Sequence, residues 1–279
     1  MLVALAALAG CGDGEQVSCP PARVQPEECR PRTVVASFYP LAWAAARVAG
    51  ASIDDVVNLT PPGVEPHDIE LSPGDAETIR DAELVVYIGG GFQPALEDAI
   101  AARERRSLNL LRDGEDPHVW LDPIRFAQAV ERIADATGGA RSAYDDIRAL
   151  TRLDADYRRG LADSRRDVLV MTHASFGHLA ARYGLTQLSL AGRSPESEPS
   201  PRELEGLIDE VRAAGATTVF AEPLVSDAIA ETVAREAGAA VATLDPVEGL
   251  SDERLEAGED YLSVMRSNLA ALREALGCR

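Results

Sequence analysis

The sequence predicts an α/β fold of two lobes, each with a parallel-sheet architecture, joined by a single long rigid helix. A first run of apolar, strand-like segments alternating with helical segments starts at residue 33. A second run of the same kind starts near residue 167, and a long amphipathic segment lies between the two runs. Strands that alternate with helices favour a parallel sheet with crossover helices, so each run is expected to form one lobe.

The first lobe is expected to contain strands at residues 33–38, 53–59 and 84–88, because each is a short apolar run of strand length. Residues 41–48 form an apolar helix between the first two strands. The Ser-Pro-Gly-Asp segment at residues 72–75 predicts the start of another helix. It places serine at the N-cap, proline at the first helical position and an acid at the third.

The second lobe repeats this pattern of strands and helices. A serine at position 200 is followed three residues later by Glu203, which is the spacing of a capping box and predicts a helix start. The expected elements are strands at residues 168–171, 217–221 and 239–244, and helices at residues 176–183, 200–213 and 259–276.

The segment between the runs carries apolar residues at every third or fourth position, with charged residues between them. This period is that of a single amphipathic helix, here about twenty residues long. Its apolar stripe consists of Tyr144, Ile147, Leu150, Leu153, Tyr157 and Leu161.

The chain begins with an apolar run, Leu2 to Ala9, that is too short to cross a bilayer as a helix. An apolar run with small residues before the processing point is typical of an export signal. Its end, Leu8-Ala9-Gly10-Cys11, resembles the bacterial lipobox, although no Lys or Arg precedes the run. We therefore expect an extracytoplasmic lipoprotein, at the cell surface or in the periplasm, anchored to the membrane through Cys11. A truncated ordinary signal is the alternative.

Residues 12–32 are rich in Pro, Glu and Gly, which is typical of a flexible tether. The predicted segments of the whole chain are an export signal with lipobox at 1–11, the tether at 12–32, an N-terminal α/β lobe at 33–138, a linking helix at 139–166 and a C-terminal α/β lobe at 167–279.

Three cysteines remain once Cys11 is lipid-modified, and an exported protein can hold a disulfide. Cys19, Cys29 and Cys278 permit one pair with one cysteine left over, and their spacing leaves the pairing open. None of them lies near a histidine in the sequence, so a cysteine-rich metal site is not expected.

The chain is strongly acidic, with a formal net charge of −19 and a sequence pI near 4.6. A nucleic-acid partner is excluded, because a phosphate backbone needs a basic face. An acidic surface concentrates cations, but acidity also simply keeps proteins soluble. The charge is therefore weak support for cation binding.

Only four histidines occur in the chain, and three of them lie where a strand or loop meets a helix. His67 follows the second expected strand, His118 precedes a helix, and His173 directly follows a strand. Asp245 follows a later strand in the same way. These positions fall at the carboxyl edge of a parallel sheet, where ligand sites gather. Three imidazoles and a carboxylate suit a tetrahedral zinc ion.

The fourth histidine is expected to have a structural role. His178 lies five residues after His173 on the following helix and therefore points to another face. The pair does not match the spacing of zinc proteases, in which four residues bring two histidines onto one helical face.

Seven segments together resemble the zinc- and manganese-type solute-binding proteins of bacterial ABC importers, often called cluster A-I. The resemblance covers almost the whole chain after the tether, and the joint order of the segments makes it specific. The segments are Ala-Ser-Phe-Tyr-Pro at 36–40, Glu-Pro-His-Asp-Ile-Glu at 65–70, Asp-Pro-His-Val-Trp-Leu at 116–121, His-Ala-Ser-Phe-Gly at 173–177, Ser-Pro-Glu-Ser-Glu-Pro-Ser-Pro at 194–201, Ala-Glu-Pro at 221–223 and Thr-Leu-Asp-Pro at 243–246.

The resemblance implies a metal site in the cleft between the lobes and transfer of the metal to a membrane permease. His67, His118 and His173 fall on the family's first three ligand positions and Asp245 on the fourth. Members that favour manganese often carry Glu at the third position, so His173 favours zinc over the alternative, manganese. The chain lacks the long His- and Asp-rich loop of many zinc members, and it carries His178 where an aromatic residue is common. We expect a monomer that is not an enzyme.

Two other functions fit a metal site and stay open at this point. A zinc hydrolase needs a coordination position open for water and a general base, and the sequence shows no catalytic signature such as Gly-x-Ser-x-Gly. An adhesin would use the metal as a structural element.

Several side chains near the ligands are candidates for supporting roles. A carboxylate can orient a ligating imidazole through its second nitrogen. Trp120 can cover the site or lie in the core, and Glu222 can lie near the site or bridge the lobes. The carboxylates close to the histidines in sequence are Asp68, Glu70, Asp116 and Asp122.

Overall fold

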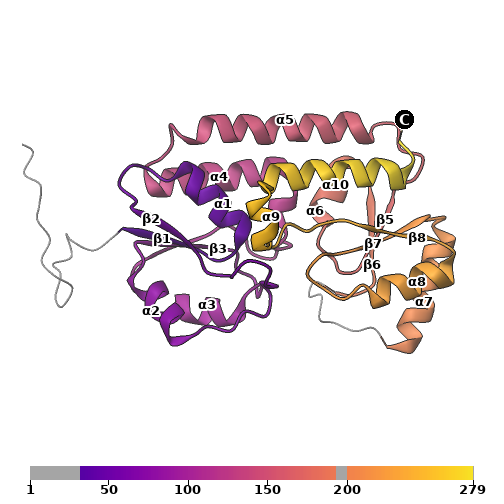
Figure 1. Ribbon diagram of the computed structural model, residues 1–279, viewed down its shortest axis with the longest axis horizontal. Coiled ribbons are helices and arrows are strands. Elements are labelled where there is room, and N and C mark those ends of the chain that lie inside the picture. Colours follow the sequence, from indigo (N-terminus) through magenta and orange to yellow (C-terminus); the bar gives the residue numbers. More distant parts are fainter. Residues whose placement is uncertain (1–31, 193–199, 279) are drawn as a thin grey trace, which may run out of the picture. The chain divides into compact units, whose positions relative to one another are not determined.

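The structure, a computed structural model, describes residues 32–192 and 200–278 (Figure 1). The expected export signal, Cys11, Cys19 and Cys29 lie outside the described residues, as does nearly all of the expected tether. Within the described ranges, Cys278 is a free cysteine. No helix there has both the length and the apolar character required to cross a membrane.

Two separate four-stranded sheets, each entirely parallel, confirm the predicted α/β fold. The first sheet has the order β2-β1-β3-β4 and the second the equivalent order β6-β5-β7-β8. The strands are β1 (Thr33–Ala36), β2 (Asp55–Asn58), β3 (Leu84–Tyr87), β4 (Arg106–Asn109), β5 (Val168–Met171), β6 (Thr186–Ser189), β7 (Thr218–Ala221) and β8 (Ala240–Thr243).

The central strands of the first sheet are apolar because helices cover both faces. Alternate residues of β1 face opposite sides, so Val34 packs in one buried cluster and Val35 in another. The cluster around Val34 includes residues of α1 and α4, and the cluster around Val35 includes residues of α2 and α3. The helices of this half are α1 (Tyr39–Val48), α2 (Pro73–Asp81), α3 (Pro94–Ala101), the short 3-10 helix η2 (Val119–Leu121) and α4 (Pro123–Thr137).

The local signals for helix starts act as the sequence predicts. Ser72 accepts a hydrogen bond from the backbone of Asp75, which completes a capping box at the start of α2. Ser200 and Glu203 form the same arrangement at the start of α7. The helices of the second half are α6 (Gly177–Tyr183), α7 (Pro201–Ala213), α8 (Ala228–Ala237), α9 (Asp252–Glu256) and α10 (Tyr261–Leu276).

One long helix, α5 (Ala143–Leu161), connects the two halves and contacts both α4 and α10, which lie beneath it in Figure 1. Its stripe is buried at Leu150, Leu153, Tyr157 and Leu161, while Tyr144 near its start is exposed. The Tyr157 hydroxyl donates a hydrogen bond to the Met265 carbonyl of α10 at 2.7 Å. The helix is therefore fixed to helices from both halves of the chain.

Candidate metal centre

The structure brings the three predicted histidines together, and Glu248 joins them. His67 lies in the loop after β2, His118 immediately before η2, and His173 two residues after β5. Glu248 lies in the loop after β8. All four residues come from loops near strand or helix ends, and each half of the chain supplies two of them.

The three imidazoles converge on a single carboxylate oxygen. The Oε1 atom of Glu248 lies 3.3 Å from Nε2 of His67 and 3.6 Å from Nε2 of both His118 and His173. The four potential ligand atoms all lie within 4.8 Å of one another. Ligand atoms about 2.0–2.1 Å from a tetrahedral zinc ion are about 3.3 Å apart, so this spacing fits one metal ion.

Two of these nitrogens have no other partner in the described structure. Nε2 of His118 and of His173 is buried and makes no hydrogen bond, because 3.6 Å to Glu248 exceeds hydrogen-bond distance. Buried polar atoms without a partner are costly unless a ligand satisfies them. A cation coordinated by these nitrogens and by Glu248 is such a ligand.

The second ring nitrogen of each of these two histidines faces a carboxylate. Nδ1 of His118 lies 2.7 Å from Asp116 Oδ1, and Nδ1 of His173 lies 2.6 Å from Glu222 Oε2. Glu222 also accepts hydrogen bonds from the Thr172 hydroxyl and the backbone N–H of His173. Carboxylates in this position fix the ring and leave Nε2 for the metal.

The histidines and the carboxylates of the centre stabilise each other's charged forms. Burial alone would lower the pKa of His118, but the carboxylates of Asp116 and Glu248 outweigh burial and raise it. Burial would raise the pKa of Asp116, yet its hydrogen bond with His118 holds that pKa below its usual value. The His118–Asp116 pair is therefore stabilised in its charged form when no metal is bound.

Burial and the neighbouring charges also oppose each other at His173 and Glu248. Burial opposes the charged imidazolium, but the carboxylates of Glu222 and Glu248 raise the pKa of His173 to about 10. Complete burial would raise the pKa of Glu248, but the three surrounding histidines hold it well below its usual value. Glu248 is thus a carboxylate at neutral pH, which is the state that binds a metal.

Glu65 adds a further carboxyl group beside His67. Its Oε2 accepts the backbone N–H of His67 at 2.9 Å, and its Oε1 lies 3.9 Å from Nε2 of His67. Burial is the main reason that its pKa rises to about 7, and the charge of Glu248 adds to the effect. Glu65 therefore lies beside the same His67 nitrogen that faces Glu248, although it is not one of the four residues of the ligand group.

The structure leaves Asp245 outside this group of four. Its Oδ2 accepts a hydrogen bond from Arg254 Nη1 at 2.8 Å, and its Oδ1 accepts the backbone N–H of Val247 at 2.7 Å. Both carboxylate oxygens are therefore engaged by other donors. Asp245 is the predicted fourth ligand, but its place in the loop after the last strand is shared by the acid three residues later, Glu248.

His178 and Trp120 lie outside the ligand group, while Asp68 and Glu70 are exposed. His178 does not join the centre; its Nε2 lies 2.9 Å from the Asp116 carbonyl oxygen, as a structural role requires. Trp120 is fully buried, packs against the His118 ring and donates a hydrogen bond to the Pro246 carbonyl at 2.7 Å. It therefore connects the His118 segment with the loop that carries Glu248.

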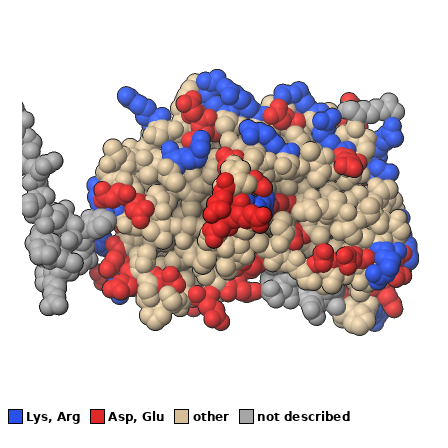
Figure 2. All heavy atoms as spheres, viewed as in Figure 1, with Lys and Arg blue, Asp and Glu red and all other residues tan. Residues whose placement is uncertain are grey.

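Acidic side chains gather on the surface at α9, the helix whose Arg254 binds Asp245 in the loop that carries Glu248. Figure 2 shows Asp and Glu gathered in the middle of the displayed face, where Figure 1 places α9. Within α9, Asp252, Glu253 and Glu256 are exposed. The negative potential of such a surface favours the approach of cations.

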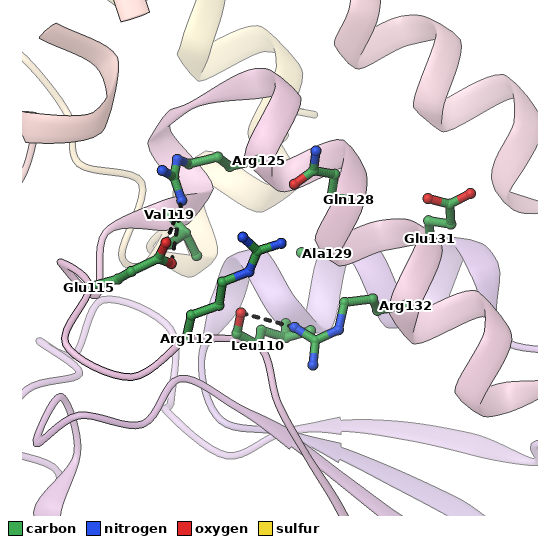
Figure 3. A pocket seen from close by; sticks show the side chains of 9 residues that line it. All are labelled: Leu110, Arg112, Glu115, Val119, Arg125, Gln128, Ala129, Glu131 and Arg132. Carbon is green, nitrogen blue, oxygen red and sulfur yellow. Dashed lines mark hydrogen bonds and ion pairs between the residues drawn. The ribbon is translucent and has the colours of Figure 1, made fainter. Parts of the chain in front are cut away.

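A separate hollow lies along α4 and is lined by three arginines (Figure 3). Its volume is about 250 Å³. Arg125 is paired with Glu115 at 3.3 Å, and Arg132 donates to the Leu110 carbonyl at 3.0 Å. Because none of the three clustered histidines lines it, this hollow is distinct from the metal centre.

Comparison with known proteins identifies relatives along almost the whole described chain. Residues 34–275 match the model of the family described as zinc-uptake complex component A, periplasmic. The chain is 32% identical to the zinc-binding protein AdcA of Streptococcus pyogenes serotype M1, over 86% of this chain and 55% of that protein. It thus spans about half the length of the AdcA relatives that it matches.

Two further similarities extend over most of both chains. The high-affinity zinc uptake system protein ZnuA of Bacillus subtilis (strain 168) is 30% identical over 87% of each chain. The solved structure of the Zn(II)-bound ZnuA-like domain of Streptococcus pneumoniae AdcA superposes with a TM-score of 0.73. It shares 32% identity and covers 88% of this chain and 99% of that domain.

Proposed function

We propose, since the chain belongs to the family of periplasmic zinc-uptake complex component A proteins, that it captures Zn²⁺ outside the cytoplasm and delivers it to an ABC importer. The observation that carries the proposal is the convergence of three Nε2 atoms on Glu248 Oε1 at 3.3–3.6 Å. Zinc is the cargo in this function. The relatives named above are zinc-binding or zinc-uptake proteins by name.

The proposed ligands are His67, His118, His173 and Glu248, with Asp245 held aside by Arg254. On the predicted division into lobes at 33–138 and 167–279, each lobe supplies two ligands. Zinc bound by all four would hold the two lobes together, and its release would require at least some of these bonds to break.

Capture is favoured over catalysis because four protein groups surround the position for the metal. A catalytic zinc site keeps one position for water or substrate, whereas a site with four protein ligands is closed. Zinc is favoured over manganese because three imidazoles and one carboxylate form a nitrogen-rich set. Manganese is better served by additional carboxylate oxygens.

The proposed partners follow from the family. The cargo is a divalent metal ion, the receiving protein is the membrane permease of an ABC importer, and the protein acts as a monomer. A lipid anchor at Cys11 would hold it at the outer side of the cytoplasmic membrane, close to that permease.

Metal content and affinity test the capture function. Protein purified without chelator is expected to hold one zinc ion per chain, and His118→Ala is expected to lose it while keeping its circular-dichroism spectrum. His178→Gln is the matched control, because His178 lies outside the ligand group and should retain the metal. A folded wild-type protein with no affinity for zinc or manganese would sink the proposal. Unfolding of His118→Ala would instead favour a structural metal, as in an adhesin.

The choice of the fourth ligand has its own test. Glu248→Gln should weaken zinc binding by roughly 10-fold or more beyond the effect of Asp245→Asn, because of these two acids Glu248 is the one grouped with the three histidines. Isothermal titration in competition with a chelator gives the two dissociation constants. A larger loss in Asp245→Asn would restore Asp245 as the ligand.

A further inference from the structure

The loop after β8 carries two buried carboxylates, and one of them lies apart from the metal centre. Asp245 is 6% exposed and Glu248 2% exposed, so both are shielded from water. Glu248 lies against the three histidines, whereas Asp245, three residues earlier, is not part of that group. The two buried carboxylates of this loop therefore have different surroundings.

The cause is a guanidinium group from the adjacent helix α9. Arg254 Nη1 donates to Asp245 Oδ2 at 2.8 Å. The other edge of the same guanidinium is fixed by Glu259, whose Oε2 lies 3.0 Å from Nε and 2.8 Å from Nη2. Arg254 is thereby held in one orientation by two acids. A planar fork held in this way directs one N–H group at Asp245.

The backbone of the loop is fixed in the same arrangement. Asn268 of α10 accepts the N–H of Asp245 at 2.9 Å and donates to its carbonyl at 2.7 Å. Val247, between the two acids, has φ +58°, which a β-branched residue rarely adopts. Its N–H donates to Asp245 Oδ1 at 2.7 Å. The contacts of Asp245 therefore hold a strained turn that separates its carboxylate from that of Glu248.

We propose that Arg254 is a positioning residue that sets the metal selectivity of the centre by holding Asp245 away from the histidines. The inference rests on the proposed zinc-binding function and deepens it. While Asp245 is hydrogen-bonded to Arg254, the groups available to coordinate the metal are three imidazole nitrogens and the Glu248 carboxylate. If Arg254 is removed, Asp245 becomes a buried carboxylate without its cation, and a bound divalent ion in the same loop region can compensate it. The added oxygen ligand then favours manganese relative to zinc.

The test uses the full chain with three variants: Arg254→Gln, Asp245→Asn and the double variant. The dissociation constants for Zn²⁺ and Mn²⁺ are measured in competition with a chelator, and Co²⁺ is used as a spectroscopic probe of coordination number. Arg254→Gln should raise the affinity for manganese relative to zinc by roughly 10-fold or more. It should also weaken the visible absorption of bound Co²⁺, because coordination above four reduces the intensity of these bands.

The double variant separates ligand exchange from a general charge effect. Like Arg254→Gln, the double variant lacks the positive charge of Arg254, but it also lacks the Asp245 carboxylate that could bind the metal. Its ratio of manganese to zinc affinity and its Co²⁺ spectrum should therefore match those of Asp245→Asn. A wild-type ratio in Arg254→Gln overturns the inference, as does a raised ratio that persists in the double variant.

Arg254→Lys keeps the inference testable if Arg254→Gln does not fold. Lysine retains the charge but lacks the planar fork that serves Asp245 and Glu259 together, so a smaller shift in the same direction is expected. An unchanged ratio in this variant overturns the inference. If the wild-type chain binds no zinc, the proposed function fails; if it binds zinc and the variants keep its ratio, only the role of Arg254 fails.

Discussion

His118 and His173 each lie between two carboxylates, one on each ring nitrogen. Asp116 and Glu222 contact the Nδ1 atoms, while Glu248 faces both Nε2 atoms. In the absence of metal this arrangement favours imidazolium, and in its presence the Nε2 protons must leave. Zinc capture is therefore an exchange of protons for a metal ion, and its affinity should increase with pH.

The protonation of His173 gives a prediction for the metal-free protein. Its pKa is raised to about 10, so the stabilisation it contributes is complete below the unfolded-state pKa of about 6.5 and is lost as the pH rises through about 10. The chain contains no lysine, so its cysteines and tyrosines are the main other groups with ordinary pKa values in this range. The melting temperature of chelator-treated protein should fall by roughly 5 °C or more between pH 7 and pH 10.

His173→Gln provides the control for this pH effect, because glutamine keeps a polar side chain without a titrating ring. Its melting temperature should depend less on pH over the same interval. An equal decline in the variant and the wild type would contradict the assignment to His173. Calorimetric scans at several pH values supply the measurement.

The site residues show what the sequence alone could and could not predict at this scale. The three histidines stand out because histidine is rare in the chain and these three lie at element ends. Asp245, by contrast, is bound by Arg254 and Asn268 from helices α9 and α10. Such contacts between distant parts of the chain leave no periodic pattern, so the sequence did not distinguish the two acids.

At the scale of elements, α5 fixes both halves of the chain through its buried stripe. Leu153 is 1% exposed, so Leu153→Ala should lower the free energy of unfolding by about 2–5 kcal/mol. Arg152→Ala, one position earlier on the exposed face, should change it by about 0.5 kcal/mol or less. Urea unfolding followed by circular dichroism measures both; equal effects would contradict the packing of this stripe.

The elements that the sequence predicts are those with strong local signals. Central strands are apolar, α5 has a clear period, and the starts of α2 and α7 carry capping boxes. Strands β4, with sequence RSLN, and β6, with sequence TQLS, have no such signal. Both are edge strands, and polar residues there are partly exposed, so only pairing with β3 and β5 reveals them.

At the scale of the whole molecule, the four proposed ligands come in equal number from the two halves of the chain. Zinc that binds the folded state alone should stabilise it by about 2.7 kcal/mol at a free concentration 100 times the dissociation constant. This corresponds to a rise in melting temperature of roughly 5–10 °C. Thermal-shift measurements with zinc and with zinc plus chelator test it.

A matched variant identifies the source of this stabilisation. Glu248→Gln removes one proposed ligand from the second half and should reduce the zinc-dependent shift, while its metal-free melting point provides the reference for any direct effect on folding. A full zinc shift in this variant would show that the metal stabilises the protein from another position.

Trp120 lies where its fluorescence can report on the proposed metal centre. Its ring centroid lies 5.2 Å from that of His118, and its indole N–H is bound to Pro246 in the loop that carries Glu248. A protonated imidazole beside an indole quenches its emission, whereas a zinc-bound imidazole carries no such proton on Nε2. The other tryptophan, Trp43, contacts Phe126, Tyr261 and Arg47. Emission from Trp120 can therefore follow the filling and emptying of the centre in real time, without any attached dye.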